Sequence, residues 1–296
     1  MINILIPAYA REIPLIGSAF GYIQDQINYK GLLSFYSANY NQAAIDNGIS
    51  VTVSEIYCDG DNLFISYIVE GEELADLYKS ENYFESQMLL ETDYTVDVNT
   101  KAIEFDKSGI EGKWINDGTA FAGVDIIEIQ GEDSALEFPE KFILNIDISS
   151  ICLLGNNSQV SDEYIKGKWI FNLNVECNYS DICEYVISES KNDHSIDKVV
   201  VSPVIITLYT SYPDIYYSRE FWNYDVVIYS DLSQDEPIAN AGNYYHTNVI
   251  TKIPRYLVEN EFDIYIIDSS TMTDEDKPYE KSTFESHAIV SAHIVL

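Results

Sequence analysis

Residues that could carry chemistry are scattered through this sequence instead of forming a catalytic motif. His287 and His293 are expected on one face of a strand, but six residues of extended chain separate them by roughly 20 Å, too far to bind one metal ion. The sequence contains no Gly-rich phosphate loop and no Gly-x-Ser-x-Gly motif. Ser, Cys, His and acidic residues are all present, but no spacing selects three of them as a nucleophilic triad. We therefore predict a protein that is not an enzyme and has no cofactor or metal site.

The four cysteines have no Cys-x-x-Cys spacing, which argues against a zinc ribbon. Cys177 and Cys183 lie six residues apart and could close a small disulfide loop in an oxidising compartment. The other interpretation is four unrelated thiols, of which Cys152 is expected to be buried. The residue pattern leaves both interpretations open.

The segment Cys58-Asp-Gly-Asp-Asn62 superficially resembles part of a calcium-binding loop. An EF-hand loop places ligands at alternating positions over twelve residues and ends on a glutamate. Counted from Asp59, the twelfth residue is Glu70, but the ligand positions between them include Leu63 and Ile65. The segment is therefore interpreted as the turn of a β-hairpin, in which Gly60 permits a positive φ.

An aromatic segment near residue 217 is the one candidate for a binding surface. It could stack a ligand or contact a partner, or it could be a packed loop that buries its rings. The candidate partner-surface residues are Tyr212, Tyr216, Tyr217, Phe221, Trp222 and Tyr224.

The chain is strongly acidic, with 49 Asp and Glu against 16 Lys and Arg and a net charge of −33. Such a charge repels phosphate backbones and anionic lipid surfaces. We therefore expect no nucleic-acid partner. The same acidity is also compatible with cation binding or simply with solubility.

Periodicity predicts helices only near the N-terminus. Residues 12–27 have apolar residues at helical spacing, and a weaker helical pattern follows over 32–44. From residue 49 onward the pattern is mostly period two, broken by turn-forming residues. The predicted strands are 49–57, 62–70, 86–98, 102–106, 123–129, 141–150, 167–177, 183–190, 195–201, 203–210, 223–231, 261–269 and 286–296.

These strands predict an all-β protein with two tandem Ig-like β-sandwich domains behind a short N-terminal helical region. The length of 296 residues also suits two domains. The expected divisions are 1–45 for the helical segment, 46–178 for the first sandwich and 179–296 for the second.

Four stretches together resemble a known family. They are the helix pattern at Ile13, Pro14, Ile16, Gly17 and Phe20; the hairpin at Asn47, Gly48, Ile49, Val51, Thr52, Tyr57, Asp59, Gly60, Leu63, Ile65 and Tyr67; the strand at Gly167, Lys168, Trp169 and Phe171; and Val200, Ser202 and Pro203. In these features the chain resembles the domain of unknown function 4179 family of Gram-positive bacteria, followed by its usual second Ig-like domain. Cys58 and the missing transmembrane segment are departures from the family pattern.

The resemblance implies the extracytoplasmic, non-catalytic half of a single-pass membrane protein that resembles anti-sigma factors. Residues 2–10 would then be the remainder of an N-terminal membrane anchor absent from this chain. The protein or cell-wall partner is not indicated. A cell-surface adhesion or wall- and carbohydrate-binding module is the alternative, and an enzyme would require a concave pocket with convergent polar groups.

Overall fold

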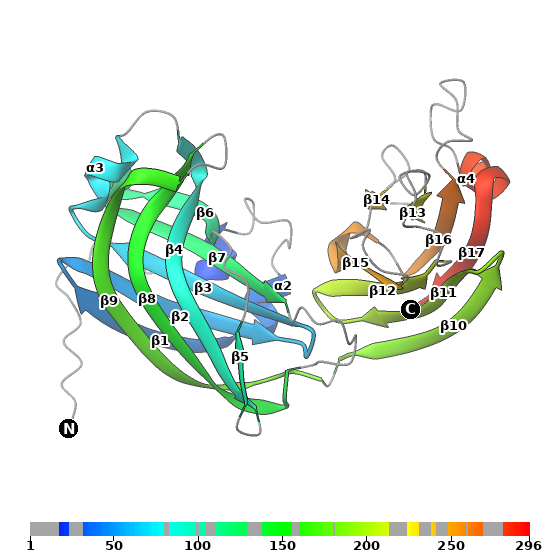
Figure 1. Ribbon diagram of the computed structural model, residues 1–296, viewed down its shortest axis with the longest axis horizontal. Coiled ribbons are helices and arrows are strands. Elements are labelled where there is room, and N and C mark those ends of the chain that lie inside the picture. Colours follow the sequence, from blue (N-terminus) through cyan, green and yellow to red (C-terminus); the bar gives the residue numbers. More distant parts are fainter. Residues whose placement is uncertain are drawn as a thin grey trace. The chain divides into compact units, whose positions relative to one another are not determined.

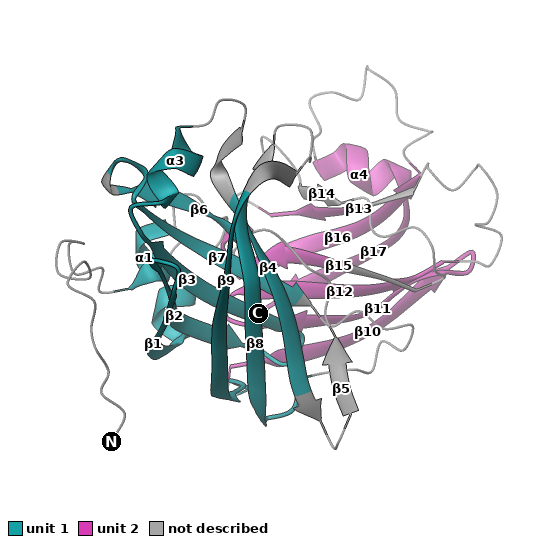
Figure 2. Cartoon of the chain, turned by 60° about the vertical axis from the view of Figure 1, so that its left-hand side comes forward, with its two compact units in different colours: residues 1–180 teal, residues 181–296 magenta. Residues whose placement is uncertain are grey.

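The computed structural model describes most of the chain in two compact units, residues 1–180 and 181–296 (Figure 2). The sequence had suggested a division after residue 178. The described residues are 18–23, 32–79, 83–98, 101–104, 110–128, 138–155, 160–179, 181–212, 224–230, 238–240, 248–258, 260–268 and 281–296.

Unit 1 consists mainly of antiparallel strands joined in hairpins (Figure 1). Its helices are α1 (Ala19–Ile23), α2 (Leu32–Tyr36) and α3 (Leu74–Tyr78), with a 3-10 turn at Asn116–Gly118. Its strands are β1 (Ala38–Asp46), β2 (Ile49–Cys58), β3 (Asn62–Glu70), β4 (Tyr83–Val98), β5 (Lys101–Glu104), β6 (Ile110–Ile115), β7 (Ala120–Glu128), β8 (Lys141–Gly155) and β9 (Val160–Glu176).

These nine strands form one continuous sheet in the order β1-β2-β3-β7-β6-β4-β8-β9, with β5 paired to β4. The predicted all-β class is confirmed. The strand order of this unit does not form the predicted Ig-like sandwich, because a sandwich needs two sheets packed face to face and these strands form one sheet. Long strands such as β8 and β9, which the sequence pattern had predicted as shorter ones, allow the single sheet to curl over its own core.

The curled sheet is held together at its two end strands by side chains. No backbone ladder joins β1 to β9, yet three hydrogen bonds cross from one to the other in antiparallel order. Two of them come from β1, Tyr40 Oη to Asn174 O (2.6 Å) and Lys168 N to Asp46 Oδ2 (2.7 Å), and the third comes from the turn residue that follows it, Asn47 Nδ2 to Lys166 O (2.7 Å). The sheet is therefore barrel-like, with one seam made by side chains.

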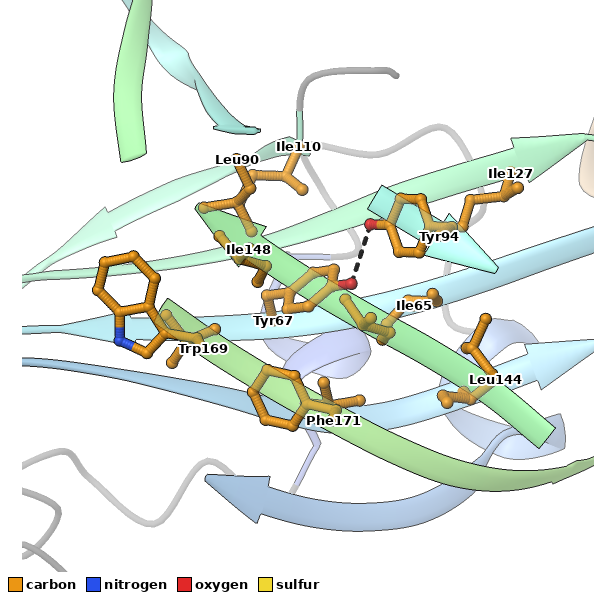
Figure 3. Close-up of a cluster of buried hydrophobic side chains, with 14 of the residues drawn as sticks. Ile65, Tyr67, Leu90, Tyr94, Ile110, Ile127, Leu144, Ile148, Trp169 and Phe171 are labelled. Atoms are coloured by element: carbon orange, nitrogen blue, oxygen red, sulfur yellow. Dashed lines mark hydrogen bonds between the residues drawn. The ribbon is translucent and has the colours of Figure 1, made fainter. Parts of the chain in front are cut away.

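The concave face of this sheet encloses the main hydrophobic core (Figure 3). Ile65 and Tyr67 of β3 face Leu144 and Ile148 of β8 across it, and all four are fully buried. Trp169 is also completely buried, and its indole Nε1 donates a hydrogen bond to Ile49 O at 3.0 Å. This bond joins β9 to the start of β2 from inside the core.

The predicted helix over 32–44 is wrong beyond residue 36, because residues 38–46 form β1. The β1 strand pairs with β2 and turns into it through Asn47 and Gly48, whose φ values are 47° and 77°. Asn41 also has a positive φ of 50°, at a register shift in this pairing, and a helix cannot contain that conformation. Of the predicted helix 12–27, the structure describes residues 18–23.

Unit 2 contains two antiparallel sheets of four strands each, in the orders β10-β11-β12-β15 and β14-β13-β16-β17. Buried side chains of both sheets belong to one core. The strands are β10 (Cys183–Lys191), β11 (His194–Val201), β12 (Ile205–Ser211), β13 (Tyr224–Tyr229), β14 (Ile238–Asn240), β15 (Asn248–Pro254), β16 (Glu261–Asp268) and β17 (Ala288–Val295). Helix α4 (Lys281–His287) covers the second sheet through Phe284, and a 3-10 turn spans Arg255–Leu257.

We predict that Trp169→Phe lowers the free energy of unfolding of unit 1 by about 2 kcal/mol. The change removes apolar volume from the core and takes away the donor that pairs with the buried Ile49 carbonyl. Denaturant unfolding followed by circular dichroism measures the difference. Lys168→Ala is the control, because Lys168 is the exposed residue that directly precedes Trp169 on the same strand. This change should alter the free energy of unfolding by less than about 0.5 kcal/mol. Equal effects of the two changes would contradict the proposed bond.

Candidate functional site

The histidines occupy separate structural positions. His194 is buried, its ring lies edge-on to Tyr212 at 5.7 Å, and its Nδ1 is 2.8 Å from Asn192 O. His293 Nδ1 lies 2.9 Å from Asp263 Oδ1. His287 ends helix α4 and not a strand, so the predicted shared strand face with His293 is wrong. Within the described part of the chain, no three His, Cys, Asp or Glu residues are placed to hold a metal ion, and His246 lies outside that part.

Most of the predicted aromatic surface falls outside the described residues. Tyr212 is described and is 92% buried, packed in the core of unit 2. Tyr224 begins β13, but its side chain is not described. The remaining members, Tyr216, Tyr217, Phe221 and Trp222, lie outside the described ranges. The surface therefore stays a prediction.

The turn at residues 58–62 is a hairpin turn, as the sequence indicated. Asp59 is 95% buried, and its Oδ1 accepts hydrogen bonds from both the backbone N (2.9 Å) and the side-chain Nδ2 (3.0 Å) of Asn62. Gly60 has a φ of 94°. The turn between β2 and β3 is therefore stabilised by hydrogen bonds between its own residues, Asp59 and Asn62.

A disulfide joins this turn to the end of the last strand of unit 1. Cys58 at the end of β2 is bonded to Cys177, which follows β9 and is 119 residues away in sequence. Cys152 is a buried free thiol and Cys183 an exposed one. The hypothesis of a Cys177–Cys183 loop is therefore wrong. Spacing along the chain suggested the nearer partner, whereas the sheet brings the distant one to a Cα–Cα distance of 4.6 Å.

Backbone hydrogen bonds secure the same end of unit 1. Asn178 N donates to Cys58 O (2.8 Å), and Phe138 N donates to Gly60 O (2.7 Å). The hydroxyl of Tyr179 donates to Phe138 O, and a Cβ on Gly60 would lie 2.7 Å from the Tyr179 ring. The chain therefore leaves unit 1 with Cys177, Asn178 and Tyr179 fastened to the hairpin turn and to the segment before β8.

A second polar cluster is buried inside the core of unit 1. The Tyr94 hydroxyl donates to Asp125 Oδ2 at 2.5 Å and lies 2.9 Å from the Tyr67 hydroxyl (Figure 3). Asp125 is 1% exposed. Burial, followed by the charge of Asp125, raises the pKa of both tyrosines well above 10. The sequence marked Tyr67 only as an apolar strand position, and no local motif distinguishes Asp125 from the other 48 acidic residues.

The remaining buried thiol is chemically inert at neutral pH. Cys152 is 3% exposed, and burial, aided by the charge of Glu91, raises its pKa to about 11. Because the thiolate is the reactive form, Cys152 is a core residue and not a candidate nucleophile. The candidate functional feature of unit 1 is instead the disulfide that joins Cys58 to Cys177.

The N-terminal part of the chain matches a known family model. Residues 1–71 match the domain of unknown function DUF4179. The resemblance predicted from the helix and hairpin motifs is thus supported over this region, which contains α1, α2 and the β2–β3 hairpin. No function is recorded for the DUF4179 domain, and the match ends before β4.

No curated protein matches the chain. Among solved structures, a conserved domain protein from Bacillus anthracis is 18% identical, over 92% of this chain and 93% of that chain, with a TM-score of 0.48. A hypothetical protein from Parabacteroides merdae is 11% identical, over 78% of this chain and 54% of that chain, with a TM-score of 0.16. Neither similarity assigns a fold or a function to this chain. In the described ranges, no helix is long and apolar enough to cross a membrane.

We predict that the double change Cys58→Ser and Cys177→Ser lowers the free energy of unfolding of unit 1 by about 2–5 kcal/mol. The disulfide closes a long loop, and its removal restores conformational freedom to the unfolded chain. Denaturant unfolding measures the loss. Cys183→Ser is the control, since this thiol is exposed and free. Alkylation of the unfolded, unreduced protein should leave Cys58 and Cys177 unmodified; their modification would refute the pairing.

We also predict that Tyr94→Phe destabilises unit 1 by about 2 kcal/mol, more than Tyr67→Phe does. The Tyr94 hydroxyl donates to the buried Asp125 carboxylate, whereas the Tyr67 hydroxyl bonds to the Tyr94 hydroxyl. Loss of a donor to a buried charge costs more than loss of a bond between two hydroxyls.

The same cluster sets a pH dependence. The folded pKa values of Tyr67 and Tyr94 lie above their unfolded value of about 10. Their contribution to stability is therefore complete below pH 10 and is lost as the pH rises above it. The free energy of unfolding should decline less steeply above pH 10 in Tyr94→Phe than in the wild type. Equal slopes would contradict the burial of this hydroxyl.

Proposed function

We propose that this chain is a non-catalytic extracytoplasmic region of a single-pass membrane protein that senses a signal or binds a partner, in the manner of the outer half of an anti-sigma factor. Unit 2 in this proposal is the Ig-like companion domain, since its two sheets share one core.

The disulfide between Cys58 and Cys177 is the observation that carries this proposal. Disulfides persist outside the cytoplasm and are rare inside it, because cytoplasmic thiols are kept reduced. This one is buried, with Cys58 2% and Cys177 5% exposed, and it joins two strands that are not neighbours in the sheet order. Those features fit a permanent structural bond in an oxidising compartment.

The match to DUF4179 and the charge of the chain add support. In the resembled family, the segment corresponding to residues 13–20 follows a membrane anchor. A net charge of −33 disfavours binding to nucleic acid and to anionic lipid surfaces, and so favours a protein or cell-wall partner. The adhesion or carbohydrate-binding module stays the alternative, and it depends on the aromatic segment that includes Trp222.

Protease shaving of intact cells that express the full-length gene product tests the location. In the proposed role, a protease added outside releases peptides from residues 32–296 while a cytoplasmic marker protein stays intact. Mass spectrometry of the same cells, alkylated before lysis, should find Cys58 and Cys177 joined. A protein that resists shaving, fractionates with the cytosol and carries free thiols at both positions would refute the extracytoplasmic proposal.

A further inference from the structure

The N-terminal helices lie on the outer face of the unit 1 sheet. We call the described residues 18–23 and 32–37, which contain α1 and α2, the strap. Helix α1 lies against β7, β3 and β2 (Figure 2). Helix α2 contacts β2. The strap side chains Ala19, Phe20, Ile23 and Leu33 are at most 1% exposed. The strap is therefore docked on the sheet.

A single buried carboxylate reaches both described parts of the strap. Glu55 of β2 is 2% exposed, and its Oε2 accepts a hydrogen bond from Phe20 N at 3.0 Å. Its Oε1 accepts a longer one from the hydroxyl of Ser37, at 3.5 Å. Phe20 belongs to the first part of the strap and Ser37 ends the second.

The sheet fixes the position of this carboxylate. The hydroxyl of Ser66 on β3 lies 3.5 Å from Glu55 Oε2, to which it can donate. The same hydroxyl is bonded to the Glu55 backbone, 3.2 Å from Glu55 O and 2.9 Å from Glu55 N, at the register shift between β2 and β3. Among the described residues, no lysine, arginine or histidine forms an ion pair with Glu55. Its negative charge is therefore stabilised by N–H and O–H donors, of which the strap supplies two.

The outer face of the sheet around Glu55 is apolar. Tyr57, Phe64, Ala122 and Val124 alternate with the core-facing residues of β2, β3 and β7, so they point to the outer face, and each is at most 1% exposed. Lys113 of β6 adds a contact from the side, with its Nζ 5.4 Å from the centre of the Tyr22 ring.

The strap has little stability of its own. Helices α1 and α2 contain five residues each, well below the length at which an isolated helix is stable in water. Within α1, the hydroxyl of Ser18 caps Gly21 N at 2.9 Å, but Phe20 N depends on the sheet for its acceptor. Order in the strap therefore comes from docking.

We propose that the strap is a detachable element of unit 1 and that Glu55 is its latch. Opening would expose the outer face of β2, β3 and β7 against which α1 lies. Glu55 acts as a positioning residue, because its carboxylate holds Phe20 N and the hydroxyl of Ser37. The proposal concerns unit 1 itself and does not depend on the extracytoplasmic location.

Native-state hydrogen exchange of the whole chain tests the proposal without any substitution. Amides of Phe20–Ile23 and Leu33–Ser37 should exchange as one group, at least tenfold faster than amides of the β8–β9 core such as Phe171, through an opening smaller than global unfolding. Exchange of the strap only together with the core would refute a detachable strap.

Glu55→Gln then tests the latch. This change keeps the shape of the side chain and removes the charge that attracts the strap donors. Strap amides should exchange about tenfold faster or more than in the wild type, while the protection of Phe171 changes by less than about twofold. Equal acceleration of strap and core, or none, would show that Glu55 is not a latch.

Glu111→Gln is the matched control. Glu111 is an exposed acid on β6, two residues from Lys113 in the same sheet. Glu111→Gln should leave the hydrogen exchange of the strap amides unchanged. If it accelerated that exchange as much as Glu55→Gln does, loss of any carboxylate from this sheet would loosen the strap. That result would refute the specific role of Glu55 as the latch. Binding of a dye specific for exposed apolar surface should rise in Glu55→Gln and not in Glu111→Gln.

Discussion

Burial of the β2–β3 hairpin on both faces is the constraint on which unit 1 depends. Inward-facing residues such as Ile65 and Tyr67 form the core, while Tyr57 and Phe64 are buried on the opposite face. Three contacts from distant parts of the unit reach this hairpin. Trp169 bonds to its beginning, Cys177 to its middle turn, and the strap to Glu55. A hairpin that is apolar on both faces is unstable alone, so sheet closure and strap docking are both needed to bury it.

Glu55 of the hairpin and Asp125 of the neighbouring β7 are buried carboxylates in opposite environments. Asp125 faces the core and accepts from a tyrosine hydroxyl, whereas Glu55 faces outward and accepts from the strap. Each is paired with donors, which offsets the cost of removing a charge from water. The hydrogen bonds of Asp125 and Tyr94 connect strands β7, β4 and β3, while those of Glu55 connect the sheet to the strap. The proposed detachable element and the buried tyrosine cluster therefore lie on opposite faces of the same sheet.

Alternation of residue types predicted most of the strands but not how they assemble. The pairs Ile49–Val51 and Leu63–Ile65 show period two clearly, and β2 and β3 lie where the pattern predicts them. Strand β6, with Gly112 and Lys113 in a short sequence, carries too weak a pattern to be predicted. The β1–β9 seam and the Cys58–Cys177 disulfide depend on strand order, which alternation does not contain. The apolar outer residues Tyr57 and Phe64 were the available signal that the outer face of this hairpin is covered, since a hairpin with one solvent-facing side would carry polar residues there.

The Cys58–Cys177 bond also determines how unit 1 would respond to tension along the chain. A pull applied between the N-terminus and unit 2 passes from β2 through the disulfide directly to residue 178. Residues 59–176 lie inside the closed loop, so their backbone is not part of the covalent path of this load. At about 3.4 Å for each extended residue, the bond withholds roughly 400 Å of contour length from stretching. In its oxidised form unit 1 is therefore a mechanical link whose covalent path is short.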